Sequence, residues 1–378
     1  LSYLLEILQS DKITINNRKD FILACFKKNG PIEFMIKLLK EIDINMKDAN
    51  GEYLLFWLYN NLDHYKLRNI LEECHDMDLS VCNNKGNNIF MEVLKKQNTQ
   101  HLDYFIYIFD KINISDIINY KNNDGDNCII LSTDEQICDG TTKKLINSGG
   151  NINVQNNNGQ TLLMLLIANK KYQDFEYVIK HNDIDVNLSD NNGKTPLMYA
   201  ADLMFDNNIY QINDNSKYFY SLLNHPKIDI NRVNHYGHNI LLYVLLHKYK
   251  KCYVQSSVQS PVLTSVTPKE SFEAYDPYML YNYKPISVSD FETKPSNNVN
   301  ESEQLINLII KHKVDLNAID YFNCSAISYM YMNEDISLLN TLLTLPDIDI
   351  NIKDIKGESL LMKLINDMES SDIKYKIF

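Results

Sequence analysis

The sequence predicts an all-α repeat solenoid, in which stacked helix-turn-helix units are joined by β-hairpin-like loops. Three observations predict it. A turn signal recurs about every 34 residues, a helix-capping residue type stands two residues after most turns, and two apolar helical stretches separate one turn from the next. A unit of this kind cannot bury its apolar faces alone, so neighbouring units must stack and share one core.

The turn signal is an Asn followed six residues later by a Gly, as in Asn187 and Gly193. Aligned in this way, the turns stand at positions 51, 86, 125, 159, 193, 237, 323 and 357. Ser80 replaces the Asn before Gly86, and Asn323 replaces one turn Gly. The spacings are 35, 39, 34, 34, 44, 86 and 34 residues, so the base period is 34. Gly is expected at these positions because it readily adopts the positive φ of the turn.

Each turn is followed by the start of a helix. The residues two positions after the turn include seven that can cap a first helical turn: Asn88, Asn127, Thr161, Thr195, Asn239, Ser325 and Ser359. Tyr53 is the exception, and Pro196 stands at a first helical position, where a missing N–H is tolerated. The pattern then predicts a first helix, as over 161–168, and a second amphipathic helix, as over 173–181.

The unit resembles the ankyrin repeat. It consists of a helix, a loop, a second helix and a hairpin that runs into "DNNGKTPLMYAAD" (190–202), and it recurs at the period of this family. The family usually has His where Met198 stands, and "INSGGNIN" (146–153) and "KHKVDLN" (311–317) are similar to the family's repeat ending. The resemblance covers nearly the whole chain. It implies a curved stack whose first helices line a concave face, with hairpin tips that project beyond it and a surface that binds another protein.

The longest gap between turns divides the predicted array. Residues 1–250 are expected to form its first part, 251–300 a disordered or irregular insertion within a repeat, and 301–378 its truncated continuation. The insertion lacks helical periodicity and is rich in Ser, Thr, Pro and Tyr. Its Ser260-Pro and Thr267-Pro pairs resemble proline-directed phosphorylation sites.

Charge and composition limit the partners. The net charge is −12 and Arg occurs only at Arg18, Arg68 and Arg232, which argues against a nucleic-acid partner. About one residue in eight is Asn, and 25 are Tyr. This bias is similar to that of repeat arrays from large DNA viruses and AT-rich protists, and it is typical of AT-rich coding.

A cytoplasmic location is expected, in the host cytoplasm if the protein is viral. No apolar run is long enough to span a membrane, since the best, over 240–246, is far too short. The seven cysteines are odd in number and form no CxxC pair, which indicates reduced thiols. The pattern begins within a helix at Leu1 and ends within one over 370–378, so both ends are expected to cut through the array.

We expect no catalytic, cofactor or metal site. His235 and His238 have no Cys or carboxylate at ligand spacing, and Cys74, His75 and Cys82 lack a fourth ligand. Paired carboxylates recur in the "DIDIN" linkers before the hairpins, which indicates architecture and not a single active site. His181, His225 and His312 end second helices. The helix dipole favours a cation at that end, so we expect each of these histidines to serve there as a cation.

The candidate partner-binding residues lie at hairpin tips and on a first helix: Tyr199, Arg232, His235, Tyr236, Tyr321 and Phe322. Tyr236, Tyr321 and Phe322 are the expected anchors because aromatic residues dominate interface hot spots. The chain is therefore predicted to be a monomeric protein-interaction scaffold. Two alternatives stay open: an adaptor of the ubiquitin-ligase type or a regulatory array whose working module lies outside this segment, and an enzyme formed by residues 251–300.

Overall fold

The computed structural model describes residues 32–40, 43–47, 51–96, 114–134, 136–137, 140–205, 212–256, 298–354 and 356–368. The chain divides into two compact units, Leu1–Asn191 and Asn192–Phe378. The described residues form helices and turns, with three isolated antiparallel bridges and no longer strand among them. The helices expected over 1–9 and 370–378, and the phosphorylation patterns at Ser260 and Thr267, lie outside the described residues.

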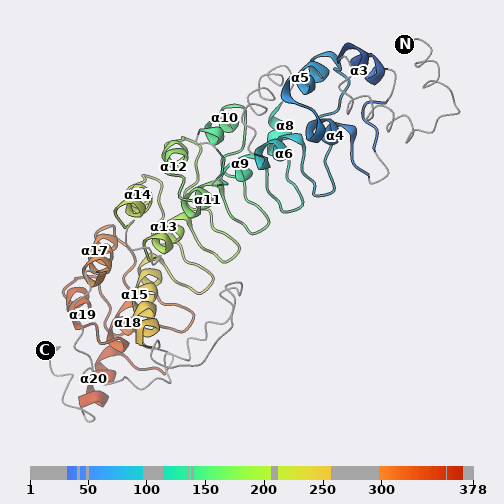
Figure 1. Cartoon of the computed structure of the whole chain (residues 1–378). Helices are drawn as coiled ribbons and strands as arrows, with labels where there is room; N and C mark the ends of the chain where they lie inside the picture. Colours follow the sequence, from blue (N-terminus) through green and yellow to red (C-terminus); the bar gives the residue numbers. More distant parts are fainter. Residues whose placement is uncertain are drawn as a thin grey trace. The chain divides into compact units, whose positions relative to one another are not determined.

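In the first unit the helices alternate between two rows (Figure 1). First helices of the repeats are α4 (Leu54–Asn61), α6 (Ile89–Lys95), α9 (Cys128–Leu131) and α11 (Leu162–Ala168). Second helices are α3 (Ile32–Leu39), α5 (His64–Glu73), α10 (Thr141–Asn147) and α12 (Tyr172–Ile179), while the short α8 (Ile114–Asn119) leads into a hairpin. The loops project from the row of first helices, as the sequence predicts for the hairpins.

The second unit repeats this order. Its first helices are α13 (Pro196–Phe205), α15 (Ile240–Ser256), α18 (Ala326–Met332) and α20 (Leu360–Met368), and its second helices are α14 (Ile212–Leu223), α17 (Asn298–Lys311) and α19 (Ile336–Leu343). Helix α15 continues to Ser256 and α17 begins at Asn298, so both ends of the stretch assigned to the insertion, 251–300, are helical.

The predicted turns and helix starts are confirmed. All eight turn residues have positive φ, from 54° at Asn323 to 82° at Gly237. The predicted capping side chains that accept a backbone N–H three residues on are Asn88, Asn127, Thr161, Thr195, Asn239 and Ser325. Tyr53 makes no such bond, and Pro196 is the first residue of α13.

The core of each unit lies between its two rows of helices. Phe56, Phe90 and Phe175 are fully buried in the first unit, and Tyr218 and Phe219 in the second. Within the second unit α13 packs against both α14 and α15, so a first helix contacts its own repeat and the next. Burying one such side chain stabilises the fold by about 1.5–3 kcal/mol, and no repeat could bury it alone.

Asparagines before the hairpins join each repeat to the next. Asn153 donates from Nδ2 to the carbonyl of Asp183 at 2.7 Å and accepts from the amide of Asp185 at 2.9 Å. The carboxylate of Asp185 accepts from the amide of Asn187. Equivalent asparagines bond to the following repeat in the same way: Asn45, Asn119, Asn231 and Asn317. The recurring Asn and the "DIDIN" carboxylates are thus part of the frame.

Candidate partner-binding surface

Equivalent positions in successive hairpins lie next to each other and form columns. The amide of Asn157 donates to the carbonyl of Asp124 at 3.2 Å, and that of Tyr321 donates to the carbonyl of Tyr236 at 3.0 Å. In both cases the residue two positions before a turn is bonded to the residue just before the preceding turn. Counting back from each turn residue, we call the positions two and four residues before it the minus-two and minus-four columns.

In the first unit the side chains of both columns bond to neighbouring hairpins. In the minus-two column, Nδ2 of Asn157 donates to the carbonyl of Asn123 at 2.9 Å, and Nδ2 of Asn191 donates to the carbonyl of Asn157 at 2.8 Å. In the minus-four column, Nε2 of Gln155 donates to the carbonyl of Ser189 at 2.9 Å. These tips satisfy their own polar groups.

In the second unit the same columns present apolar and aromatic side chains to solvent. Tyr321 occupies the minus-two column, Val233 and Ile319 occupy the minus-four column, and Tyr236 stands just before its turn. The exposed fractions are 74% for Tyr321, 51% for Val233, 47% for Ile319 and 43% for Tyr236. We call these four residues the tip patch. They share two hairpins joined by the bond between Tyr321 and Tyr236.

The tip patch rests on a buried polar cluster. The ring of Tyr236 stacks on that of His238, with centroids 5.8 Å apart and planes 24° apart. Nε2 of His238 lies 3.5 Å from Oδ2 of Asp320 in the next hairpin, and the hydroxyl of Tyr329 donates to the same oxygen. Contacts of this kind hold the two hairpins in one arrangement before any partner binds.

Opposing effects act on the carboxyl of Asp320. Burial raises its pKa, whereas hydrogen bonds from His238, from Tyr329 and from the Cys324 amide lower it. The bonds prevail, and the pKa lies below its ordinary value. Asp320 is therefore a charged, fully engaged support of the hairpin.

The structure brings together five of the six predicted binding residues. Tyr236 and Tyr321 are in the tip patch, and Phe322 beside them is half-buried. His235 is exposed on the hairpin of Tyr236, and Arg232 is exposed beside it. The Arg232 guanidinium lies 3.3 Å from Asp229, an exposed pair of small energetic weight.

Tyr199 lies apart, on α13, and is already engaged. The ammonium of Lys194 lies 4.6 Å from the centre of its ring and pairs with Asp202. The same carboxylate accepts from the hydroxyl of Tyr243 at 2.7 Å and lies 3.2 Å from Nε2 of His247. This half-buried cluster links α13 to α15.

Val233 and Ile319 were not among the predicted binding residues. With the hairpins aligned, the two stand next to each other in the minus-four column, which reads Lys121, Gln155 and Ser189 before them and Lys353 after them, with Lys47 and Cys82 at its start. Taken one at a time, hydrophobic residues within a hairpin suggest core packing. Comparison with the residues at the same position in the other hairpins is needed to distinguish them from structural residues.

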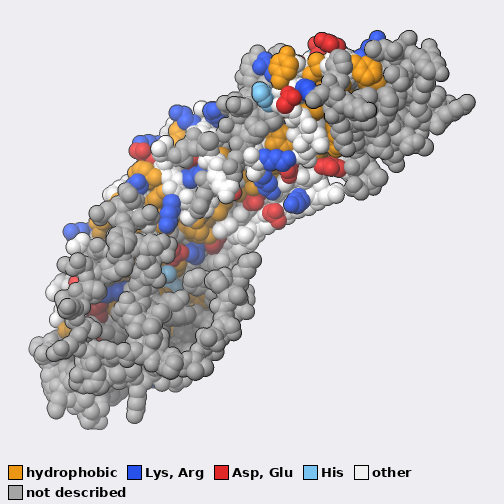
Figure 2. Space-filling model, viewed as in Figure 1, with side chains coloured by type: hydrophobic (Ala, Val, Ile, Leu, Met, Phe, Trp, Pro, Cys, Tyr) orange, Lys and Arg blue, Asp and Glu red, His pale blue; other side chains and the backbone are white. Residues whose placement is uncertain are grey.

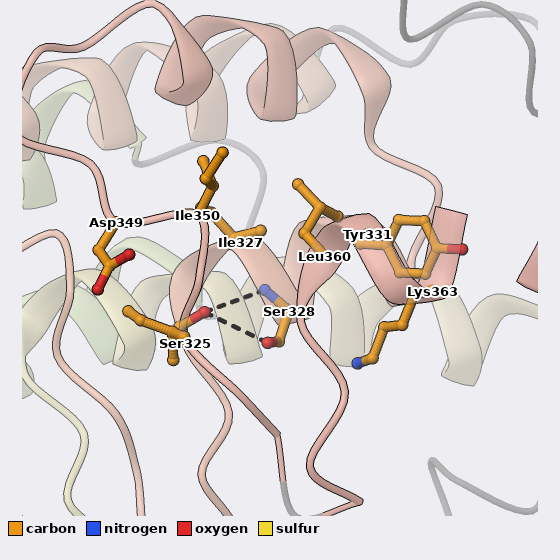
Figure 3. A pocket seen from close by; sticks show the side chains of 9 residues that line it. Ser325, Ile327, Ser328, Tyr331, Asp349, Ile350, Leu360 and Lys363 are labelled. Atoms are coloured by element: carbon orange, nitrogen blue, oxygen red, sulfur yellow. Dashed lines mark hydrogen bonds between the residues drawn. The ribbon is translucent and has the colours of Figure 1, made fainter. Parts of the chain in front are cut away.

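Potential metal-ligating side chains are dispersed over the described part of the chain. No group of three or more His, Cys, Asp or Glu side chains is arranged there to hold a metal ion. A cavity of about 10 Å³ beside Ser325 and Ser328 has room for about one water (Figure 3). Ser325 Oγ accepts from the amide of Ser328 at 3.3 Å. The polar wall of this cavity is therefore the N-terminal cap of α18.

Two of the helix-terminal histidines bond to backbone amides two residues on. Nδ1 of His181 accepts from the amide of Asp183 at 3.3 Å, and Nδ1 of His225 accepts from the amide of Lys227 at 3.2 Å. Both rings therefore contact the backbone that follows their helices. The ring of His312 faces the carbonyl of Leu308 at 3.1 Å.

On the face shown in Figure 2, Lys and Arg are interspersed with Asp and Glu over the described residues. Among the helices described, none is long and apolar enough to cross a membrane. The described cysteines, Cys74, Cys82, Cys128 and Cys324, are free thiols.

The sequence and the structure are similar to known repeat proteins. A family model described as ankyrin repeats (3 copies) matches residues 135–234. The structure is similar to the ankyrin repeat domain of Bcl-3, a member of the IkappaB protein family, with 14% identity, 74% of this chain and 94% of that chain covered, and a TM-score of 0.49. No curated protein matches the sequence.

Two further structures are similar. The ankyrin repeat protein EF0377 is 15% identical, with 69% of this chain and 98% of that chain covered and a TM-score of 0.43. An ankyrin repeat domain from Acinetobacter baumannii AYE is 20% identical, with 53% and 95% covered and a TM-score of 0.41. The family match identifies ankyrin repeats over residues 135–234, and it gives no support to the expected viral or protist origin.

Proposed function

Because the chain is an all-α ankyrin repeat array, we propose that it is a protein-binding scaffold whose second unit holds a partner through the tip patch. One observation carries the proposal. The minus-two and minus-four columns are polar and bonded between hairpins in the first unit, and they become exposed aromatic and aliphatic residues at Tyr321, Val233 and Ile319. An exposed apolar cluster of this kind is typical of an interaction site.

The support beneath the patch favours tight recognition. The ring of Tyr236 stacks on that of His238, whose Nε2 lies 3.5 Å from Asp320 of the neighbouring hairpin. A partner therefore meets rings that are already ordered, and little conformational entropy is lost on binding. Tyr236 and Tyr321 are proposed as the anchors, with His235, Arg232 and the half-buried Phe322 at the edge of the contact and Tyr199 outside it.

The test is recovery of partners from the native cell by the full chain. The double variant Tyr236→Ala/Tyr321→Ala should lose most of the proteins that the wild type recovers, because removing a hot-spot aromatic costs about 2 kcal/mol or more. The matched control is Tyr65→Ala, since Tyr65 is 63% exposed but lies on α5 in the first unit. If the double variant and the control recover the same proteins as the wild type, the patch is not the binding surface.

Monomeric state and a cytoplasmic location remain part of the proposal, the latter supported by the free thiols among the described cysteines. The division of the array at residues 251–300 also stands as a proposal. The adaptor or regulatory-array alternative requires a working module outside this segment, and no described residue favours it over the scaffold. An enzyme formed by residues 251–300 is not favoured by any described residue either.

A further inference from the structure

We propose that the tip patch binds a proline-rich segment of another protein in the polyproline II conformation. This inference rests on the proposed function and specifies the kind of segment that the patch takes. A polyproline II helix makes no hydrogen bonds of its own, so its carbonyl oxygens are free to accept from a binding protein. The tip patch offers donors for such carbonyls, apolar surface for proline rings, and a backbone that is closed to a partner strand.

The two tyrosines of the tip patch present hydroxyls that are free to donate. Neither the hydroxyl of Tyr236 nor that of Tyr321 bonds to any residue that the structure describes. By contrast, the hydroxyl of Tyr243 donates to Asp202 at 2.7 Å. A tyrosine with an exposed ring and a free hydroxyl packs against a proline ring and donates to a carbonyl of the same segment, which is how aromatic surfaces bind polyproline II helices.

The backbone of the two hairpins is unavailable to a partner strand. Every amide over 234–238 and 320–324 donates a hydrogen bond within the array. The amide of His235, for example, donates to the carbonyl of Asn192 at 3.0 Å. A strand added by a partner needs free backbone groups at the edge that it joins, and these ranges offer no free amide. A helix uses the carbonyls along its length in its own hydrogen bonds, so they are not available to the tyrosine hydroxyls.

Charges of both signs surround the tip patch, so an uncharged segment complements it better than an acidic or a basic one. On one side, the guanidinium of Arg232 lies 3.3 Å from Asp229. On the other side, the linker and hairpin of the last described repeat expose Asp349 as well as Lys353. Proline and aliphatic side chains carry no charge, and they suit such a surface. A nucleic acid does not, since its binders present a basic face.

Val233 and Ile319 provide the remaining contact surface. They expose aliphatic side chains in the minus-four column of the two hairpins, which suits aliphatic residues placed between prolines. Both sides of the contact are ordered before they meet, because a proline-rich segment is stiff and the ring of Tyr236 stacks on that of His238. Little conformational entropy is therefore lost on binding.

The first unit also exposes a tyrosine at a hairpin, but without these features. Tyr120 is 46% exposed, and its hydroxyl is hydrogen-bonded with Cys82. The residues of the minus-four column beside it are Cys82 and Lys121, which offer no aliphatic surface of this kind. Tyr120 is therefore the matched control for the tyrosines of the tip patch.

The experiment selects a phage-displayed library of random short peptides on the full chain and measures binding of the enriched peptides by fluorescence anisotropy. Enriched peptides should carry more than one proline, with aliphatic residues between them and little net charge. Their affinity should fall about tenfold or more for Tyr236→Ala/Tyr321→Ala, and severalfold for Tyr236→Phe/Tyr321→Phe, which removes only the hydroxyls. Tyr120→Ala should leave the affinity unchanged, added salt should change it little, and alanine in place of the prolines of the peptide should weaken it severalfold.

The outcomes separate this inference from the proposed function. Peptides that depend on the two tyrosines but lack proline, or that are charged and sensitive to salt, overturn the polyproline II inference and leave the binding surface in place. Full affinity of Tyr236→Phe/Tyr321→Phe also overturns it, because the hydroxyls then donate nothing. No enrichment overturns the inference as well, and recovery from the native cell then decides the proposed function alone. Peptides that bind Tyr236→Ala/Tyr321→Ala as well as the wild type overturn both.

Discussion

In the first unit the minus-two column is Asn in successive hairpins, at Asn84, Asn123, Asn157 and Asn191, while in the second unit it is His235 and then Tyr321. The backbone bond between hairpins is the same in both units, at 3.0–3.2 Å. The side chains differ in their use. Asparagine amides of the first unit bond to the preceding hairpin, and the rings of the second unit point outward to solvent.

The same hairpin backbone can therefore carry tip side chains that bond to the neighbouring repeat or tip side chains that are exposed to a partner. A side chain that bonds to a neighbouring repeat stabilises the array and is unavailable to a partner. A side chain released from that bond adds little to stability and becomes free to vary. The side chains of Gln155 and Asn191, which stand at such tips, therefore belong to the frame.

The largest expected effect on stability concerns the turn glycines. In Gly125→Ala the new Cβ would lie 2.6 Å from the backbone nitrogen of Asn157, in addition to the unfavourable positive φ of 78°. We expect a loss of about 3 kcal/mol in the free energy of unfolding. Gly357→Ala has the same φ of 78° and no described atom within 4 Å, so it should lose only about 1 kcal/mol. Equal urea midpoints for the two variants would contradict the close stacking of the first unit.

The next effect depends on pH, with opposite signs in the two units. Burial raises the pKa of Asp354, but the bonds from Lys363 and from backbone amides lower it by more, so the pKa lies below its ordinary value. The pKa of Asp320 is lowered in the same way. A carboxyl whose folded pKa is below its ordinary value of 3.8 stabilises the fold above that pH, and this contribution is lost as the pH falls through the folded pKa. Burial raises the pKa of Asp126 in the first unit, so acidification stabilises that hairpin.

Asp320→Asn should therefore lower the free energy of unfolding by about 1–2 kcal/mol at neutral pH, and the difference from wild type should shrink below about pH 4. Thermal unfolding across pH measures it. Asp347→Asn serves as the control, because this exposed side chain should leave the free energy of unfolding within about 0.5 kcal/mol of wild type. A constant difference between Asp320→Asn and wild type down to strong acid would exclude the charged form of Asp320 as the support of the tip patch.

A smaller effect is expected from the ladder of asparagine amides. Asn157→Ala removes the bond to the carbonyl of Asn123 and should cost about 1 kcal/mol. His235→Ala keeps the backbone bond to the carbonyl of Asn192 and should stay within about 0.5 kcal/mol of wild type. Urea unfolding compares the two, and a larger loss for His235→Ala would reverse the assignment of the columns.

The smallest change in stability is expected when the first-unit residue is placed in the second unit. In Tyr321→Asn the new amide can donate to the carbonyl of His235, as Asn157 does to Asn123. Stability should rise by about 0.5 kcal/mol, while affinity for the partner falls. Chemical unfolding and the recovery assay measure the two properties on one variant, and a loss of both would show that Tyr321 supports the fold.

Much of the frame could be predicted because its signals are local. Gly193, Thr195 and Pro196 determine a turn, a cap and a helix start through the preferences of their own backbone and side chains. The length of α15 could not be predicted in this way. Its extension beyond the first-helix length is supported at Lys248, whose ammonium lies 2.5 Å from Asp335 at the start of α19, far along the chain.

The candidate site was predicted in part. The sequence singled out Tyr236 and Tyr321 because aromatic residues at a turn have no evident structural duty. It also singled out Tyr199, which the structure places under the ammonium of Lys194, and it missed Val233. Exposure and pairing depend on residues in other repeats, so they are not visible in the properties of one hairpin.

The sequence by itself determined the repeat, its period of 34, the turns and the helix starts, since each follows from residues a few positions apart. Only the tertiary structure decided which tip side chains are bonded to a neighbouring hairpin and which remain exposed. The reason is physical: the partners of Asn157 and the support of Tyr236 come from adjacent repeats, at distances that stacking alone sets.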